Sequence, residues 1–198
     1  MLKNLGLAIL LVTIGLVGPT LSAHAQPTAA EIQELKKDAA KGDSAAQLFL
    51  GDAYLTGNGV PKDVATGLKW IQKSANQKDR EAQFLLGLAY FSGEGKKRDM
   101  VKAVEWFRKS AEQGLKYAQF FLGDAYRLGI GVPQDQLKAN EWFQKAADQG
   151  EPRAQYFLGQ AYAIGQGAPQ DLTKAKEWLL KAASQGHDKA KTKLDELK

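Results

Sequence analysis

The sequence contains no cysteine, so disulfide bonds, a lipid anchor on an N-terminal cysteine and thiol catalysis are all excluded. Histidine is almost absent too: besides His24 there is only His187, and a lone histidine cannot supply the ligand cluster of a zinc site. Near a helix end, such a histidine is typically solvated or capping. No serine is followed three positions later by lysine, so the nucleophile motif of penicillin-binding proteins is missing. These absences predict a protein that is not an enzyme and holds no cofactor or metal ion.

A strong charge of one sign is also lacking, because the formal net charge is only +5. Basic and acidic residues are mixed along every repeat, and one loop at residues 96–98 (Lys96-Lys97-Arg98) is wholly basic. This mixture is typical of a solvated surface and disfavours a nucleic-acid partner. The basic loop fits a solvated loop, with an acidic contact as the alternative.

Long apolar runs are missing except near the N-terminus, between Leu5 and Val17. This run follows Lys3 and precedes Ala23-His24-Ala25, which is the layout of a secretory signal peptide over residues 1–25, cleaved before Gln26. It is shorter than the about 20 residues that a membrane-spanning helix needs, although an uncleaved anchor stays open. We expect an exported, periplasmic protein without a membrane span after cleavage, or alternatively a secreted one.

Four residue types recur at intervals of 36 residues, which identifies a tandem repeat. They are Trp70, Trp106, Trp142 and Trp178; Gly51, Gly87, Gly123 and Gly159; Tyr54, Tyr90, Tyr126 and Tyr162; and Asp63, Asp99, Asp135 and Asp171. Such a period is typical of a solenoid built from stacked helical units.

Each repeat has the pattern of two helices. In the third repeat, apolar residues at helical spacing end at Gly129-Ile130-Gly131, and a second apolar stripe that includes Trp142 follows Asp135. The aspartates are expected to cap the second helices, and the tryptophans to be core residues. Gly67, inside a predicted helix, is expected to weaken its repeat relative to alanine. The first repeat is predicted to have helices near residues 45–55 and 64–77, with the same limits shifted by 36 in later repeats.

The predicted fold is therefore an all-α solenoid of four helix-turn-helix repeats with a capping helix at each end. Its segments are an N-terminal cap at 26–45, repeats at 46–81, 82–117, 118–153 and 154–189, and a C-terminal cap at 190–198.

The pattern Ala-x-x-x-Leu-Gly-x-x-Tyr-x-x-Gly-x-Gly, followed by Asp, Lys-Ala, Trp and Lys-Ala-Ala, resembles the Sel-1-like repeat family, which is related to the tetratricopeptide repeats. The first repeat departs from it, with Thr66-Gly67 in place of Lys-Ala and Lys78 in place of glycine. The resemblance implies a right-handed superhelix of antiparallel helix pairs that holds other proteins. A cysteine-rich exported branch of the family is associated with β-lactam binding or hydrolysis, and this chain lacks those cysteines.

A second stripe lies opposite the core stripe of Ala46, Leu50 and Ala53 on the first helices, and we expect it to line a concave groove. We expect a monomeric scaffold whose groove binds a protein or peptide. Large apolar groups would anchor the partner segment, and charged groups would fix its register. Its residues are Leu48, Asp52, Leu55, Phe84, Leu88, Phe91, Phe120, Asp124, Arg127, Tyr156 and Gln160, with Ala163 last. The alternative is that these rings pack only between neighbouring first helices.

Two other functions stay open at this stage. One is a secreted factor that binds a protein of a host or a neighbouring cell. The other is an envelope hydrolase of β-lactam type, which the residues support least.

Overall fold

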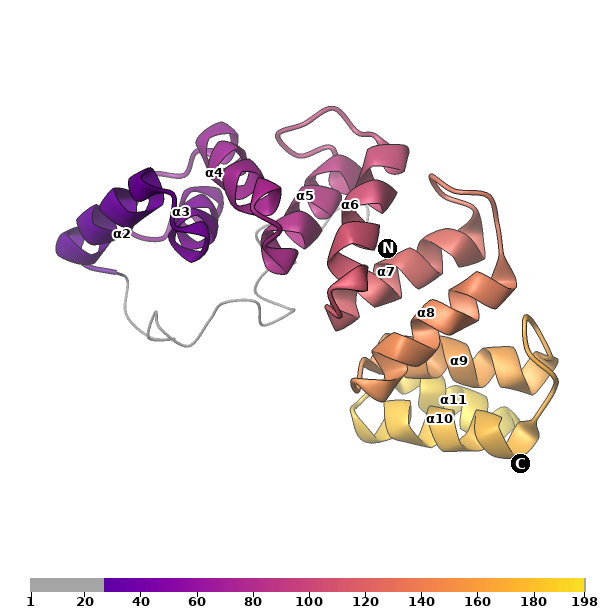
Figure 1. Cartoon of the computed structure of the whole chain (residues 1–198). Helices are drawn as coiled ribbons and strands as arrows, with labels where there is room; N and C mark the ends of the chain where they lie inside the picture. Colours follow the sequence, from indigo (N-terminus) through magenta and orange to yellow (C-terminus); the bar gives the residue numbers. More distant parts are fainter. Residues whose placement is uncertain (1–26, 198) are drawn as a thin grey trace. The chain divides into compact units, whose positions relative to one another are not determined.

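The computed structural model describes residues 27–197, and every regular element in this range is an α-helix (Figure 1). The helices are α2 (Ala29–Lys41), α3 (Ser44–Thr56), α4 (Val64–Asn76), α5 (Arg80–Ser92), α6 (Met100–Glu112), α7 (Lys116–Leu128), α8 (Gln136–Asp148), α9 (Pro152–Ile164), α10 (Leu172–Ser184) and α11 (Asp188–Glu196). The predicted all-α array of helix pairs is confirmed, and the limits of the paired helices agree with prediction to within one residue. The predicted signal peptide lies outside the described residues.

Aspartate side chains begin the second helix of every pair, as predicted. The Oδ1 atom of Asp63 accepts a hydrogen bond from the Thr66 backbone amide at 3.0 Å, and Asp99, Asp135 and Asp171 make the equivalent contact at the same distance. The Thr66 hydroxyl and amide lower the pKa of Asp63, and the backbone amide bond is the main cause that lowers the pKa of the other three.

Glycines in the left-handed conformation end the first helices, because this backbone geometry strains a residue with a Cβ atom. Gly57, Gly93, Gly129 and Gly165 all have a positive φ. Gly114, Gly150 and Gly186 do the same after second helices, whereas Lys78, with φ 69°, holds the equivalent place after α4. Lys78 is the one residue other than glycine with a positive φ among those the structure describes.

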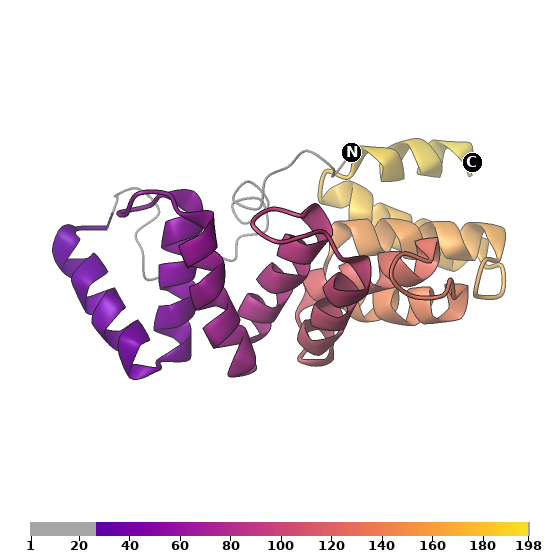
Figure 2. The ribbon, with the colours of Figure 1, turned by 90° about the horizontal axis from the view of Figure 1, so that it is seen from above.

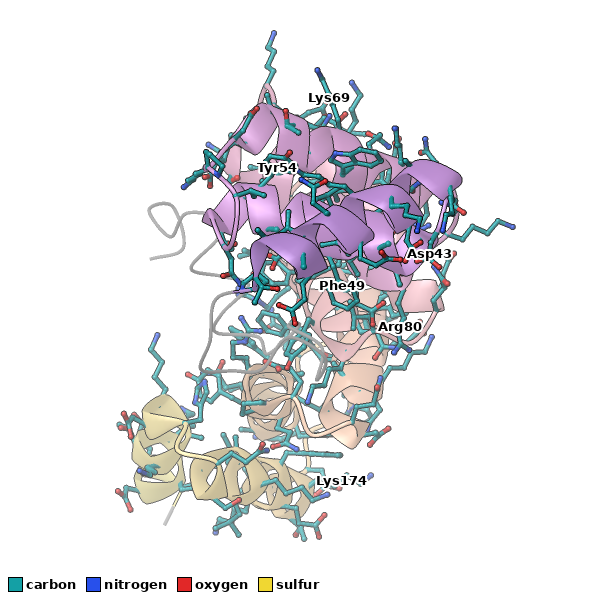
Figure 3. The ribbon with its side chains drawn as sticks, turned by 90° about the vertical axis from the view of Figure 1, so that its left-hand side faces the viewer. Asp43, Phe49, Tyr54, Lys69, Arg80 and Lys174 are labelled. Carbon is teal, nitrogen blue, oxygen red and sulfur yellow. The ribbon has the colours of Figure 1, made fainter. Side chains whose placement is uncertain are left out.

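The described residues divide into two compact units, one that ends at Ser110 and one that begins at Ala111. In the first unit, α3 packs against α2 and α4, and α4 against α5 (Figures 1 and 2). Ala39, Ala46 and Leu50 form one buried cluster between these helices, with Tyr54 packed against it. Lys69 of α4 projects into solvent, and Phe49 and Tyr54 both come from α3 (Figure 3).

A close contact between α3 and α4 explains Gly67. A Cβ atom on Gly67 would lie 2.8 Å from the Gly51 carbonyl oxygen and 2.9 Å from Cγ of Leu55. The expectation that glycine merely weakens this helix relative to alanine is therefore wrong, because the neighbouring helix leaves no room for a methyl group at this position.

In the second unit, α7 pairs with α8 and α9 with α10, while α8 packs on α9 and α11 on α10. The last helix covers Leu179 and Ala182 with Ala190, and Leu194 and Leu197 pack against the edge of this cluster. Helix α11 thus caps the end of the unit.

A buried glutamine in each first helix links it to the preceding helix. The Nε2 atom of Gln155 donates to the Ala147 carbonyl oxygen at 3.1 Å, and its Oε1 atom accepts from Gln185 at 2.8 Å. Gln47, Gln83 and Gln119 make the same bond to the carbonyl eight residues earlier, at 3.0 to 3.3 Å. Each of these carbonyl oxygens also accepts a bond from the backbone amide three residues later, so the glutamine supplies its second hydrogen bond.

The tryptophans are not full core residues, which corrects the prediction. Trp70, Trp106, Trp142 and Trp178 are each half-buried, and a lysine three positions later covers the ring, with Nζ 3.9 to 4.1 Å from its centroid. The outer face of each tryptophan ring is therefore covered by a lysine side chain and not by a neighbouring helix.

Candidate functional site

The predicted groove residues fall into two groups of different exposure. Five of them are buried: Leu55 (2% exposed), Phe84 (0%), Leu88 (2%), Phe120 (4%) and Ala163 (5%). The other seven are half-buried, namely Leu48, Asp52, Phe91, Asp124, Arg127, Tyr156 and Gln160. The prediction that Phe84, Leu88 and Phe120 are accessible anchors of a groove is therefore wrong.

The buried members in the first unit are packing residues. The ring of Phe84 lies 5.7 Å from that of Phe107 on α6, and Phe107 in turn fills the space above Gly87. Leu55 occupies the room left by Gly67. Side chains opposite the core stripe are thus used to join neighbouring helices.

The second unit brings several predicted residues together with residues that the sequence reasoning missed. The guanidinium carbon of Arg153 lies 4.2 Å from the centroid of the Phe120 ring. Phe120 stacks on Phe157 at 6.2 Å, and Arg127 lies 4.4 Å from the centroid of the Phe157 ring. We call these four residues, contributed alternately by α9 and α7, the arginine–phenylalanine ladder. The ring of Phe143 on α8 packs against both phenylalanines of the ladder, with its centroid 5.4 Å from that of Phe157 and 5.9 Å from that of Phe120.

Each arginine of the ladder is held by one acidic residue of its own segment. Both Nε and Nη2 of Arg127 donate to Oδ1 of Asp124, at 2.8 and 2.6 Å, and Nε of Arg153 donates to Oε1 of Glu151 at 2.6 Å. Both arginine side chains are nevertheless 31% exposed. The ladder therefore presents two oriented guanidinium groups at the surface of the second unit.

Tyr156 and Gln160 lie next to the ladder on α9 and contact each other, because Nε2 of Gln160 donates to the Tyr156 hydroxyl at 2.8 Å. Tyr156 also stacks on His187 with ring centroids 4.6 Å apart. Burial lowers the pKa of His187, and no side-chain hydrogen bond caps α11. The expectation of a solvated or capping histidine is corrected to an aromatic stacking partner.

A cavity of about 230 Å³ adjoins the Arg127 end of the ladder. Its lining combines aromatic, amide and basic side chains from four helices and one loop: Arg127, Gln136, Asn140, Phe143, Phe157, Gln160, Ala161, Ile164, Gln166 and Lys193. Two predicted groove residues, Arg127 and Gln160, therefore line a real concavity.

The first unit offers a different environment. Asp52 on α3 has a buried Oδ1 atom without a hydrogen-bond partner among the described residues, and burial raises its pKa to about 6. A second cavity of about 300 Å³ lies between α2 and α3, where Phe49 and Leu35 meet Glu31, Glu34 and Asp38. Asp52 is not among the residues that line that cavity.

Sequence reasoning missed Phe157, Arg153 and the buried glutamines. The glutamines carried a signal, because Gln47, Gln83, Gln119 and Gln155 recur at the same 36-residue interval as the tryptophans. Arg153 stands where the preceding repeat has Tyr117, and such a departure at a variable position marks a local feature of one repeat. Phe157 shares its repeat position with the buried Phe121, so its partial exposure could not be read from spacing.

Two negative findings apply only to the part of the chain that the structure describes. No group of three or more histidine, cysteine or acidic side chains there could hold a metal ion. Among residues 27–197, no helix is both long and apolar enough to span a membrane.

Comparison with known families decides the classification. The Sel1 repeat matches four consecutive segments, residues 44–79, 80–115, 116–151 and 152–187. The chain belongs to the Sel1 repeat family. Proteins of this family are helical scaffolds that generally bind other proteins and are generally not catalytic.

Several solved structures are similar to the chain. A protective antigen of uropathogenic Escherichia coli shares 40% identity, with a TM-score of 0.78 over 80% of this chain and 34% of the antigen. A Sel1 repeat protein of Oxalobacter formigenes shares 37% identity, with a TM-score of 0.75 over 81% of this chain and 66% of that protein. An immunity protein of Pseudomonas aeruginosa shares 28% identity, with a TM-score of 0.51, over 80% of this chain and 58% of that protein.

The chain thus spans about a third of the E. coli antigen and just under two thirds of the O. formigenes protein. No curated protein matches it.

Proposed function

We propose that this Sel1 repeat protein is a non-catalytic scaffold that binds a protein or peptide segment at the arginine–phenylalanine ladder and the adjoining cavity of its second unit. The observation that carries the proposal is the pair of partly exposed guanidinium groups, each stacked on an aromatic ring and each oriented by an acid. Arginine and aromatic side chains are the residues that most often dominate the energy of protein interfaces.

Preorganisation supports the same proposal. Phe120 and Phe157 restrict the positions that Arg153 and Arg127 can take. Little side-chain entropy is therefore lost when a partner binds, and more of the contact energy is available for affinity.

The ladder is also specific to this part of the chain. At the repeat position of Arg127, the other repeats have Leu55, Phe91 and Ala163. At the repeat position of Arg153, they have Ala45, Glu81 and Tyr117. Because no other repeat carries an arginine at either position, packing common to all repeats does not account for the pair.

The proposed compartment is the bacterial periplasm. Its support is the layout of residues 1–25 and the bacterial source of the two solved structures that share 37% and 40% identity with the chain. Cell fractionation of the source bacterium tests the compartment: retention inside the outer membrane is expected.

A second candidate is a factor that acts outside the cell on a protein of a host or neighbouring cell. The similarity to a protective antigen of uropathogenic E. coli favours it. Recovery of the protein from culture medium would support this alternative over the periplasmic proposal. A β-lactam hydrolase has no comparable support in the structure.

Affinity capture with residues 26–198 tests the binding proposal. A ladder variant with Arg127→Gln and Arg153→Gln is compared with the unchanged chain and with a control variant, Lys138→Gln with Lys174→Gln, which removes the same charge from exposed lysines of second helices. We expect proteins that the unchanged chain and the control retain but the ladder variant loses, with equal circular dichroism for all three. Equal retention by the ladder variant would refute the assignment of the surface.

A further inference from the structure

The cavity beside Arg127 is lined by positive charge without any acidic residue. Arg127 and Lys193 are its ionisable lining groups, from α7 and α11, and its remaining polar lining consists of glutamine and asparagine amides. Opposite charge is therefore the complement that this lining favours in a ligand.

Arg127 has hydrogen-bonding capacity left for such a ligand. Its acidic neighbour Asp124 uses one oxygen to accept from Nε and Nη2, so the hydrogens of Nη1 have no partner among the described residues. The guanidinium plane is held against the Phe157 ring. A planar guanidinium with a free edge is suited to bind a second carboxylate, which a lysine at this place could not hold in the same two-point manner.

Lys193 supplies the second positive charge of the cavity. Its Nζ atom forms an ion pair with Oε2 of Glu196 at 2.6 Å. The Lys193–Glu196 pair comes from consecutive turns of α11, and both side chains keep contact with solvent. Exposed pairs of this kind contribute little, so the lysine can turn toward an anion at small cost.

The amides around the cavity are fixed by the protein itself. Asn140 donates to the Gln166 carbonyl oxygen at 2.8 Å, Gln136 to the Arg127 carbonyl oxygen at 3.0 Å, and Gln160 to the Tyr156 hydroxyl. Each amide nitrogen has a second hydrogen, which leaves donors along the walls. Phe143, Phe157 and Ile164 provide apolar surface for the methylene groups of an acidic side chain.

We propose that the cavity binds the carboxylate of an aspartate or glutamate side chain in the partner segment, with Arg127 as the principal contact and Lys193 as the second. This inference rests on the proposed function and specifies the chemistry of the partner. The cavity volume of about 230 Å³ fits one side chain rather than a folded element.

Nuclear magnetic resonance of residues 26–198 labelled with nitrogen-15 tests this inference through the Arg127 Nε–H signal. The probe is a capped pentapeptide, acetyl-Ala-Leu-Glu-Leu-Ala-amide, compared with the same peptide carrying glutamine and with sodium acetate at matched ionic strength. We expect a saturable shift of the Arg127 signal with the glutamate peptide alone. In the variants, binding is followed through the backbone amide signals of the cavity residues Gln160 and Gln166. Arg127→Gln should weaken binding by roughly tenfold or more, because a charge-assisted hydrogen bond is lost, and Lys193→Gln by less.

Lys138→Gln, on the exposed start of α8, is the matched control and should bind the glutamate peptide normally. Equal shifts with the glutamine peptide, the absence of saturation, or a response to acetate but not to the peptide would each overturn the inference. The capture experiment separates this failure from failure of the proposed function. If the ladder variant loses captured proteins but the glutamate peptide does not bind, the carboxylate inference fails and the proposed function stands. If the glutamate peptide binds but capture by the ladder variant is unchanged, the proposed partner surface fails.

Discussion

At the residue scale, the carboxylate of Asp52 stands out because one of its oxygens is buried in the first unit with no donor among the described residues. The equivalent residues of the later repeats are better accommodated: Leu88 is apolar, Asp124 is paired with Arg127, and Gln160 donates to Tyr156. An ionised group in such surroundings opposes folding, because burial removes its hydration without supplying a counter-charge.

We predict that Asp52→Asn stabilises the protein at neutral pH. The pKa of Asp52 is raised to about 6, so between about pH 4 and pH 6 the folded state binds more protons than the unfolded chain. Stability of the unchanged protein therefore falls as pH rises through this range, by about 2 to 3 kcal/mol relative to the variant. Urea denaturation at a series of pH values measures the difference, which should vanish below about pH 4. A difference for Asp52→Asn that stays constant across the pH series would contradict the prediction.

A second residue-scale prediction concerns Lys78, which adopts a positive φ of 69° where the later repeats have glycine. The left-handed conformation costs a residue with a Cβ atom about 1 to 2 kcal/mol, part of which the greater freedom of unfolded glycine offsets. Lys78→Gly should therefore raise the free energy of unfolding by about 1 kcal/mol in chemical denaturation. Lys78→Ala removes the same side chain but keeps the strain, and an equal gain from alanine would show that the backbone is not the cause.

At the element scale, the ends of the helices are determined by local residues that recur every 36 positions in the sequence. Aspartate caps and left-handed glycines lie within a few residues of the helix ends that they determine, so the predicted limits agree with the structure. The surface residues could not be predicted equally well. A helical wheel separates Phe84 and Phe120 from the core stripe, but it does not show that Phe107 and Phe143 from other helices cover them.

The arginine–phenylalanine ladder could not be predicted either, because it also depends on contacts between different helices. Phe157 and Phe121 share one repeat position, yet Phe157 is the one that receives Arg127 on its ring. Contacts of this kind join residues on different helices that are far apart in the sequence, and they depend on side-chain size in both helices. A single sequence states the residue types but not which of them fill the space between helices.

The α3–α4 contact gives an element-scale prediction. Gly67→Ala should lower the free energy of unfolding by about 1 to 3 kcal/mol, despite the higher helix propensity of alanine, because its methyl group meets the Gly51 carbonyl oxygen and Leu55. Leu55→Ala, which opens the same space, should make the double variant more stable than the sum of the two single changes implies. Thermal denaturation of the four proteins tests both statements. A more stable Gly67→Ala protein would disprove the close contact.

At the scale of the whole molecule, repeat proteins gain stability from contacts between neighbouring helices, so an uncovered terminal helix is costly. Helix α11 covers Leu179 and Ala182 of α10, and its own exposed face is polar, with Lys189, Lys191 and Glu196 exposed. This arrangement matches the predicted terminal cap.

Ending the chain after Gln185 should therefore lower the free energy of unfolding by about 3 kcal/mol, since Ala190, Leu194 and Leu197 no longer cover α10. Guanidinium denaturation followed by circular dichroism measures the change. Leu194→Ser with Leu197→Ser in the full chain retains the main chain of the helix and should reproduce part of the loss. Unchanged stability after truncation would mean that α11 is not a cap.

The buried glutamines have an evolutionary consequence. Since each one bonds the carbonyl eight residues before it, and since the bond has the same form in every repeat, a recombination event between two equivalent codons would insert or delete one whole module and leave the junction chemistry unchanged. Arrays of different length could then diverge from one ancestral gene without an intermediate that fails to fold.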